Sequence, residues 1–248
     1  SLRRDASVRE RLAELAPDVI VVAAYGLFLP SDVLETPRLG CLNVHPSLLP
    51  KYRGPSPVAT SILSGDEVTG VTVMKITEEM DSGPIVAQSE TAIGPDETGG
   101  QLTVRLFQMG AELTVDALPR WEGGEIRARP QDDSKATVTR LLSREDGEID
   151  WQLPAVKIAR EVRAYHPWPG SFTRWDGRLL KVLEASALDA DGACEPAGTV
   201  VTLPDGGLGV AAGEGVLELR RLQLEGRRAV GAREFLRGQL GFVGARLG

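Results

Sequence analysis

The 248-residue sequence contains few residues suited to redox or metal chemistry, with only two cysteines and two histidines. Cys41 and Cys194 are far apart and form no C-x-x-C motif, so we expect neither a disulfide framework nor a structural zinc site. No apolar run is long enough to span a bilayer, and we expect no secretory leader. The sequence therefore predicts a cytoplasmic protein without a metal and without a membrane partner.

The sequence also lacks the excess of positive charge that is typical of a dedicated nucleic-acid binder, because its net charge is −7. The charge is unevenly distributed along the chain. Residues 1–150 carry 15 Lys and Arg against 24 Asp and Glu, a net −9, whereas residues 151–248 carry 13 against 11, a net +2. This asymmetry indicates two bodies with different partners, and does not by itself establish nucleic-acid binding.

Strand and helix patterns alternate through the first 118 residues. Four stretches have the β-branched or alternating pattern of strands, namely residues 19–24, 42–45, 69–76 and 85–93. Three stretches have helical spacing, namely residues 8–15, 57–63 and 98–118, of which the last is the longest. Interleaved strands and helices predict an α/β layer, and the continuous apolar run at 19–24 is typical of a parallel sheet covered on both faces.

The remainder of the chain has a different pattern. Residues 119–144 are polar and irregular, which predicts a linker, and an amphipathic helix is expected at 154–165. Short strand patterns separated by Gly and Asp turns follow, at residues 179–183, 199–203, 208–212 and 216–222. Short strands at near-regular spacing predict a small β-barrel.

Three polar residues stand at or after the ends of predicted strands, where open α/β sheets bind ligands. The Asn43 amide can hold a carbonyl oxygen at any pH, and His45, if made cationic by a carboxylate, can donate to an oxyanion. Asp81 can orient the imidazole and assist proton removal. Because no Ser or Cys is placed as a conventional nucleophile, the set predicts direct transfer of an acyl-type carbon to an amine. Each residue alone is better explained by an ordinary loop or turn, and only their co-occurrence favours chemistry.

The residues after His45 extend this candidate site. Ser47, Leu48, Leu49 and Pro50 form a proline-bounded loop that can line a flat apolar slot. Lys51 and Arg53 follow, and their cations suit an anionic ligand tail or a phosphate backbone. A solvated rim is the alternative interpretation of these two cations.

The run NVHPSLLPKYRGPSPV, followed downstream by MDSGPI, closely resembles the formyltransferases that use 10-formyltetrahydrofolate. This resemblance implies that Asn43, His45 and Asp81 are catalytic and that residues 47–50 contact the folate. By the same resemblance, the turn at 24–30 is a pterin-side loop, with Tyr25, Gly26 and Leu29 as further candidates. It also implies a partial Rossmann-like parallel-sheet domain and a folate co-substrate.

The Ile149-Asp150-Trp151 run and the segment 163–170 resemble the C-terminal, OB-like barrel of the members that formylate methionyl-tRNA. The resemblance implies a catalytic domain at 1–118, a linker at 119–144 and a tRNA-binding barrel at 145–248. The implied reaction is formyl transfer to the α-amine of methionyl initiator tRNA in translation initiation, by a monomer. In those members the sheet begins upstream of the present Ser1, so we expect this chain to be part of a longer gene product.

The densest basic stretch lies near the C-terminus, and its charge alone predicts a solvent-exposed face. In a tRNA-using family the expectation changes to phosphate contact by Arg220, Arg221, Arg227 and Arg228. Other acceptors and roles stay open at this point. They are an amino sugar nucleotide acceptor, a hydrolase- or dehydrogenase-type domain acting on formylfolate, and a non-catalytic binding remnant.

Overall fold

The structure is a computed structural model that describes residues 5–188 and 195–248, so Cys194 lies outside the described residues. The chain divides into two compact units. The first comprises Ser1–Ser61, Asp66–Gly94 and Gln101–Leu141, and the second comprises Ile62–Gly65, Pro95–Gly100 and Leu142–Gly248. In the described part of the chain, no helix combines the length and the apolar character needed to cross a membrane.

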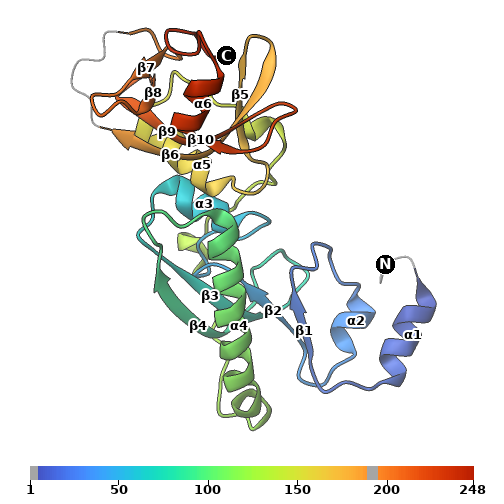
Figure 1. Ribbon diagram of the computed structural model, residues 1–248. Coiled ribbons are helices and arrows are strands. Elements are labelled where there is room, and N and C mark those ends of the chain that lie inside the picture. The colour runs from blue at the N-terminus through green and yellow to red at the C-terminus, as the bar shows by residue number, and fades with distance from the viewer. Residues whose placement is uncertain (1–4, 189–194) are drawn as a thin grey trace. The chain divides into compact units, whose positions relative to one another are not determined.

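The first unit contains a four-stranded sheet in the order β1-β2-β3-β4 (Figure 1). Its strands are β1 (Ile20–Ala23), β2 (Cys41–His45), β3 (Val68–Lys75) and β4 (Ile85–Ala92). The predicted α/β class is confirmed. The sheet is parallel between β1 and β2 and antiparallel at the other two pairings. β3 and β4 pair antiparallel because a loop without a helix joins them, whereas parallel neighbours need a longer crossover.

Helix packing explains why β2 presents its polar residues together. The helices of this unit are α1 (Ala6–Glu14), α2 (Ser31–Glu35), the first part of α3 (Pro57–Ser64) and, from Gln101 onward, α4 (Gly99–Glu122). Leu113 and Leu118 of α4 pack against a buried cluster that contains Leu42 of β2. Because side chains alternate along a strand, Asn43 and His45 share the opposite face.

The segment expected to be a linker belongs largely to the first unit. Its first residues continue α4 as far as Glu122, and the unit extends to Leu141. Beyond α4 the segment is mostly irregular, as predicted, with one short 3-10 turn, η1 (Asp133–Lys135). It nevertheless pairs with the rest of the unit through single bridges, Ile85 with Arg129 and Arg53 with Val138.

The second unit is built on a six-stranded antiparallel sheet that curls around its core, in the order β5-β6-β9-β8-β7 with β10 added to β9 (Figure 1). Its elements are η2 (Glu145–Gly147), α5 (Ala155–Ala164), β5 (Ser171–Trp175), β6 (Arg178–Leu188), β7 (Val200–Thr202), β8 (Leu208–Ala211), β9 (Val216–Leu224), β10 (Val230–Gly231) and α6 (Ala232–Gly238). The predicted barrel-type domain corresponds to this sheet. Phe235 and Phe242 pack edge to face in its core, with ring centroids 4.9 Å apart.

Candidate active site

The structure brings together the three side chains that the sequence singled out. Asn43, the only asparagine of the chain, and His45 lie on one face of β2, and Asp81 lies in the loop between β3 and β4. Asn43 Nδ2 is 3.5 Å from Asp81 Oδ1, and His45 Nδ1 is 3.7 Å from Asp81 Oδ2. One carboxylate therefore faces both an amide and an imidazole.

The hydrogen bonding of His45 defines its tautomer. Its Nε2 is 2.9 Å from the carbonyl oxygen of Tyr52, which can only accept, so Nε2 carries the proton. In the neutral ring Nδ1 is then a bare acceptor directed toward Asp81. His45 thus presents a basic nitrogen toward the carboxylate.

Burial lowers the pKa of His45 below its usual value of 6.5, because desolvation disfavours the imidazolium. The Asp81 carboxylate and the Tyr52 carbonyl act in the opposite direction, and burial outweighs them. The ring is only 4% exposed. Burial therefore favours the neutral imidazole over the imidazolium. The sequence predicts the neighbouring carboxylate but not the depth of burial.

Backbone geometry fixes Asp81 in place. Its φ of 50° lies in the left-handed region, which Asp tolerates better than most residues. The backbone N–H of Gly54 donates to Asp81 Oδ2 at 2.8 Å. Gly54 itself has a φ of 100°, and a Cβ there would lie 2.8 Å from the Thr139 carbonyl oxygen. The chain thus needs glycine at the position that donates to the carboxylate.

The loop at 47–50 turns two of its four side chains into the protein. Ser47 is fully buried and donates its hydroxyl to the Lys51 carbonyl, while Leu49 packs with Met74 and Ile85. Thr72 of β3 ties the loop down, donating to the Ser47 carbonyl and accepting from the Leu49 N–H. Among the predicted folate-loop residues, Leu48 and Pro50 are the half-buried ones.

The two cations at the predicted rim have carboxylate partners. Lys51 pairs with Asp66 at 2.8 Å, and its side chain is 48% exposed. Arg53 is only 13% exposed and contacts Gln131 and Asp133. Sequence reasoning treated Gln131 as part of a linker, and no local pattern indicated its place beside Asp81.

Three of the four tail arginines that the sequence assigned to tRNA are in surface ion pairs. Arg220 pairs with Glu218, Arg221 with Glu184 and Arg228 with Glu234, at N–O distances of 2.8, 3.3 and 2.7 Å respectively. Each of these arginine side chains is more than half exposed. Arg227 is also exposed. A role in phosphate contact stays a prediction.

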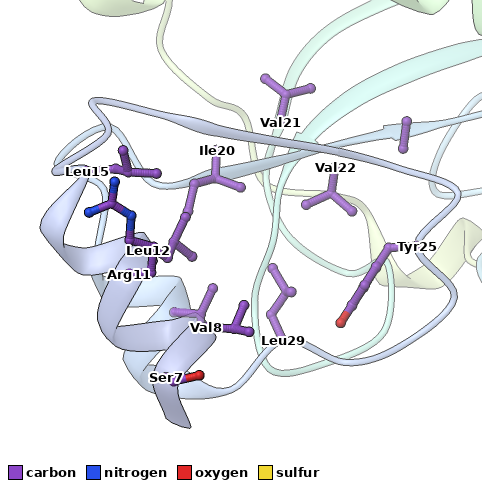
Figure 2. Close-up of a pocket in the computed structure, with 12 residues that line it drawn as sticks. Ser7, Val8, Arg11, Leu12, Leu15, Ile20, Val21, Val22, Tyr25 and Leu29 are labelled. Atoms are coloured by element: carbon purple, nitrogen blue, oxygen red, sulfur yellow. The ribbon is translucent and has the colours of Figure 1, made fainter. Parts of the chain in front are cut away.

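Tyr25 and Leu29, the pterin-side candidates, line a cavity of about 610 Å³ beside α1 and β1 (Figure 2). Most of its lining is apolar, with Leu12 and Val8 from α1 and Ile20 from β1 facing it. Gly26 lies in the same turn with a φ of 70°. Neither Asn43, His45 nor Asp81 lines this cavity.

Known proteins match the chain over both units. The family described as "Formyl transferase" matches residues 1–118, and the family described as "Formyl transferase, C-terminal domain" matches residues 141–240. A methionyl-tRNA formyltransferase of Chloroflexus aurantiacus is 51% identical over 236 residues, which is 95% of this chain and 76% of that protein. The chain belongs to the methionyl-tRNA formyltransferase family.

Solved structures share the fold at lower identity. HypX from Aquifex aeolicus, solved with tetrahydrofolic acid, superposes with a TM-score of 0.70 at 21% identity, covering 96% of this chain and 42% of that one. The methionyl-tRNA formyltransferase from Clostridium thermocellum has a TM-score of 0.59 at 21% identity, covering 74% of this chain and 78% of that one. These likenesses establish the α/β and C-terminal folds of the family.

Proposed function

We propose that the chain transfers a formyl group from 10-formyltetrahydrofolate to the α-amine of methionyl-tRNA. The observation that carries this proposal is the convergence of Asn43, His45 and Asp81, with both ring nitrogens of His45 accounted for. The 51% identity to a protein named methionyl-tRNA formyltransferase supports this acceptor over an amino sugar nucleotide.

Asn43 stabilises the charge that develops on the formyl oxygen when the amine adds to the formyl carbon. Its amide carries two N–H groups, and one of them faces Asp81, which leaves the other for the oxyanion. An uncharged amide donates in this way at any pH. Asn43 therefore acts as an electrostatic stabiliser of the tetrahedral intermediate.

His45 moves the proton. Its bare Nδ1 takes a proton from the attacking amine as the new carbon–nitrogen bond forms, and the Asp81 carboxylate stabilises the imidazolium that results. The imidazolium then gives this proton to N10 of the folate as the bond between N10 and the formyl carbon breaks. Tetrahydrofolate leaves, and N-formylmethionyl-tRNA is released.

The donor is expected to bind beside this trio, on the loop at 47–50. Leu48 and Pro50 supply the side chains of that loop that are not fully buried, and the loop is held to β3 through Thr72. Such a loop offers a rigid apolar edge with backbone groups, which suits a flat ring system. Tyr25, Gly26 and Leu29 are proposed for the pterin side on the basis of the motif resemblance.

A formylation assay tests this function. The protein is incubated with 10-formyltetrahydrofolate and methionyl initiator tRNA, and formylmethionine is measured after the ester is hydrolysed. We expect formyl transfer that requires the charged tRNA. Formate release that is independent of tRNA, or transfer to an amino sugar nucleotide in preference to methionyl-tRNA, would contradict the proposal.

A further inference from the structure

Gln131 holds the backbone of the Asp81 loop at Asp81 itself and at Gly83, two residues later. Its Nε2 donates to the carbonyl oxygens of Asp81, at 2.7 Å, and Gly83, at 2.8 Å. Gly83 cannot be replaced easily, since a Cβ there would lie 1.8 Å from the Lys75 carbonyl oxygen. The loop that carries Asp81 is therefore pinned between β3 and one amide group from a distant part of the chain.

Arg53 fixes that amide group in turn. Its Nε and an Nη donate to Gln131 Oε1 at 3.0 and 2.8 Å, and the same Nη pairs with Asp133 at 2.7 Å. The Gln131 side-chain oxygen can only accept, and it faces donors of the Arg53 guanidinium. Its NH2 group can only donate, and it faces two backbone carbonyl oxygens. Both ends of the amide therefore have matched partners in one orientation. Because these contacts hold the guanidinium, the Arg53 side chain lies against the protein and not in solvent.

The same segment also orients the partner of His45. The Tyr52 N–H donates to the Thr137 hydroxyl at 2.8 Å, and Arg53 exchanges backbone hydrogen bonds with Thr137 and Thr139. The Tyr52 carbonyl, which accepts from His45 Nε2, follows directly. Gln131, Thr137 and Thr139 thus brace both neighbours of the imidazole, Asp81 on one side and Tyr52 on the other.

We propose that Gln131 and Arg53 are positioning residues for formyl transfer: Gln131 keeps the Asp81 carboxylate facing His45, and Arg53 keeps Gln131 in place. The proposal deepens the proposed function and rests on it, in that Asp81 must act through His45. It assigns to Arg53 an internal role in place of the contact with tRNA that its position in the sequence suggested. Small displacements of catalytic groups cost large factors in rate, which makes such positioning consequential.

The titration of His45 gives a readout that does not depend on activity. The Asp81 carboxylate raises the pKa of His45, and burial lowers it. The residue paired with His45 on β3, Thr72, carries no charge, and the Tyr52 carbonyl is the other group that favours the imidazolium. If Asp81 moves away, the pKa of His45 falls further. A purely structural role for Gln131 elsewhere would leave this pKa unchanged.

The test uses Gln131→Met, which keeps the side-chain volume and removes the amide. NMR titration follows His45, whose signal is assigned by comparison with His166→Gln, because the chain has only two histidines. Ser134→Ala is the matched control, since Ser134 lies in the same segment and its side chain donates to Asp132. Gln131→Asn, one methylene shorter, is a second variant that retains the amide.

We expect Gln131→Met to lower kcat between about tenfold and a hundredfold with little change in the KM of either substrate. The midpoint of the His45 titration should move to lower pH, in the same direction as in Asp81→Asn. Gln131→Asn should shift both quantities in the same direction by less, and Ser134→Ala should match the wild type.

Three results would overturn the proposal: an unchanged kcat, a reduced kcat with an unchanged His45 titration, or a change confined to the KM for tRNA. If Gln131→Met does not fold, the same criteria apply to Gln131→Asn. Absence of methionyl-tRNA formylation by the wild-type protein would instead refute the proposed function. The titration would then still report whether Gln131 positions Asp81.

Discussion

The trio of Asn43, His45 and Asp81 and the arginine-bearing surface of the second unit differ in how their charges are held. At the trio, His45 is 4% exposed, and hydrogen bonds from two separate segments, the turn at 52–54 and Gln131, hold His45 and Asp81. On the second unit, Arg220, Arg221 and Arg228 form single ion pairs at the surface. Buried, pre-organised groups act strongly on a reaction, whereas exposed ion pairs are screened by solvent and salt. Changes in the first region should therefore alter rate steeply, and changes in the second should alter affinity mildly.

The largest effect is expected from Asp81→Asn. The substitution keeps the side-chain size and removes the charge that stabilises the imidazolium of His45, so kcat should fall between about a hundredfold and ten-thousandfold. Single-turnover formylation of methionyl-tRNA measures this loss. Asp176→Asn is the matched control, because Asp176 is an exposed aspartate with the same φ of 50° in the turn between β5 and β6. Equal rates for the two variants would remove Asp81 from the mechanism.

The next effect separates positioning from tRNA contact at Arg53. Arg53→Met keeps the apolar stem and removes the donors to Gln131, so we expect kcat to fall about tenfold while the KM for tRNA stays constant. Steady-state kinetics over a range of tRNA concentrations give the two parameters separately. A raised KM for tRNA with an unchanged kcat would restore the interpretation of Arg53 as a phosphate contact.

The pH dependence of stability should report the burial of His45. The folded-state pKa of His45 lies below the unfolded value of about 6.5. The unfolded chain therefore binds more protons below that pH, and this contribution to stability is fully present above pH 6.5 and is lost as pH falls. Between pH 7 and pH 5.5 the wild type should lose more unfolding free energy than His45→Gln. Urea unfolding at both pH values measures this, and equal losses in the two proteins would count against a depressed pKa.

The smallest effect is expected at the tail arginines. Arg228→Gln removes one exposed charge, so the affinity for methionyl-tRNA should weaken about two- to threefold. The slope of log affinity against log salt concentration should become less steep by about one. Arg120→Gln, which removes an exposed arginine paired with Glu125, is the control. Binding is measured at several salt concentrations. Identical salt slopes for the two variants would contradict a phosphate contact at Arg228.

Much of the local structure could be predicted from the sequence, because it depends on local pattern. Periodicity indicated β2, α4 and α5, and the alternation in β2 placed Asn43 and His45 on one face. Strand direction was harder. The parallel pairing of β1 with β2 agrees with the predicted parallel-sheet domain, whereas the antiparallel pairings of β2 with β3 and β3 with β4 were not predicted. In the second unit, β5 (Ser171–Trp175) and α6 (Ala232–Gly238) were not predicted, since each is short and carries charged residues.

The long-range contacts of the site could not be predicted. Nothing in the polar run around Gln131 indicates that its amide contacts the carbonyl of Asp81, 50 positions earlier. Such a contact depends on the tertiary path of the chain and not on local sequence. Likewise, Arg53 lies two residues after Lys51 in a turn and resembles a solvated residue, yet its side chain is only 13% exposed beside Gln131 and Asp133. The neutral state of His45 follows from burial, which the sequence pattern does not quantify.

The most direct test of the central claim is a double-mutant cycle between Asn43 and Asp81, measured as the single-turnover rate of formyl transfer. If the two side chains act on the same reacting carbon as one unit, Asn43→Ala should lower the rate about a hundredfold or more, and the double variant should be little slower than the slower single variant. Losses that multiply independently would show that the two groups act separately, and would contradict the account.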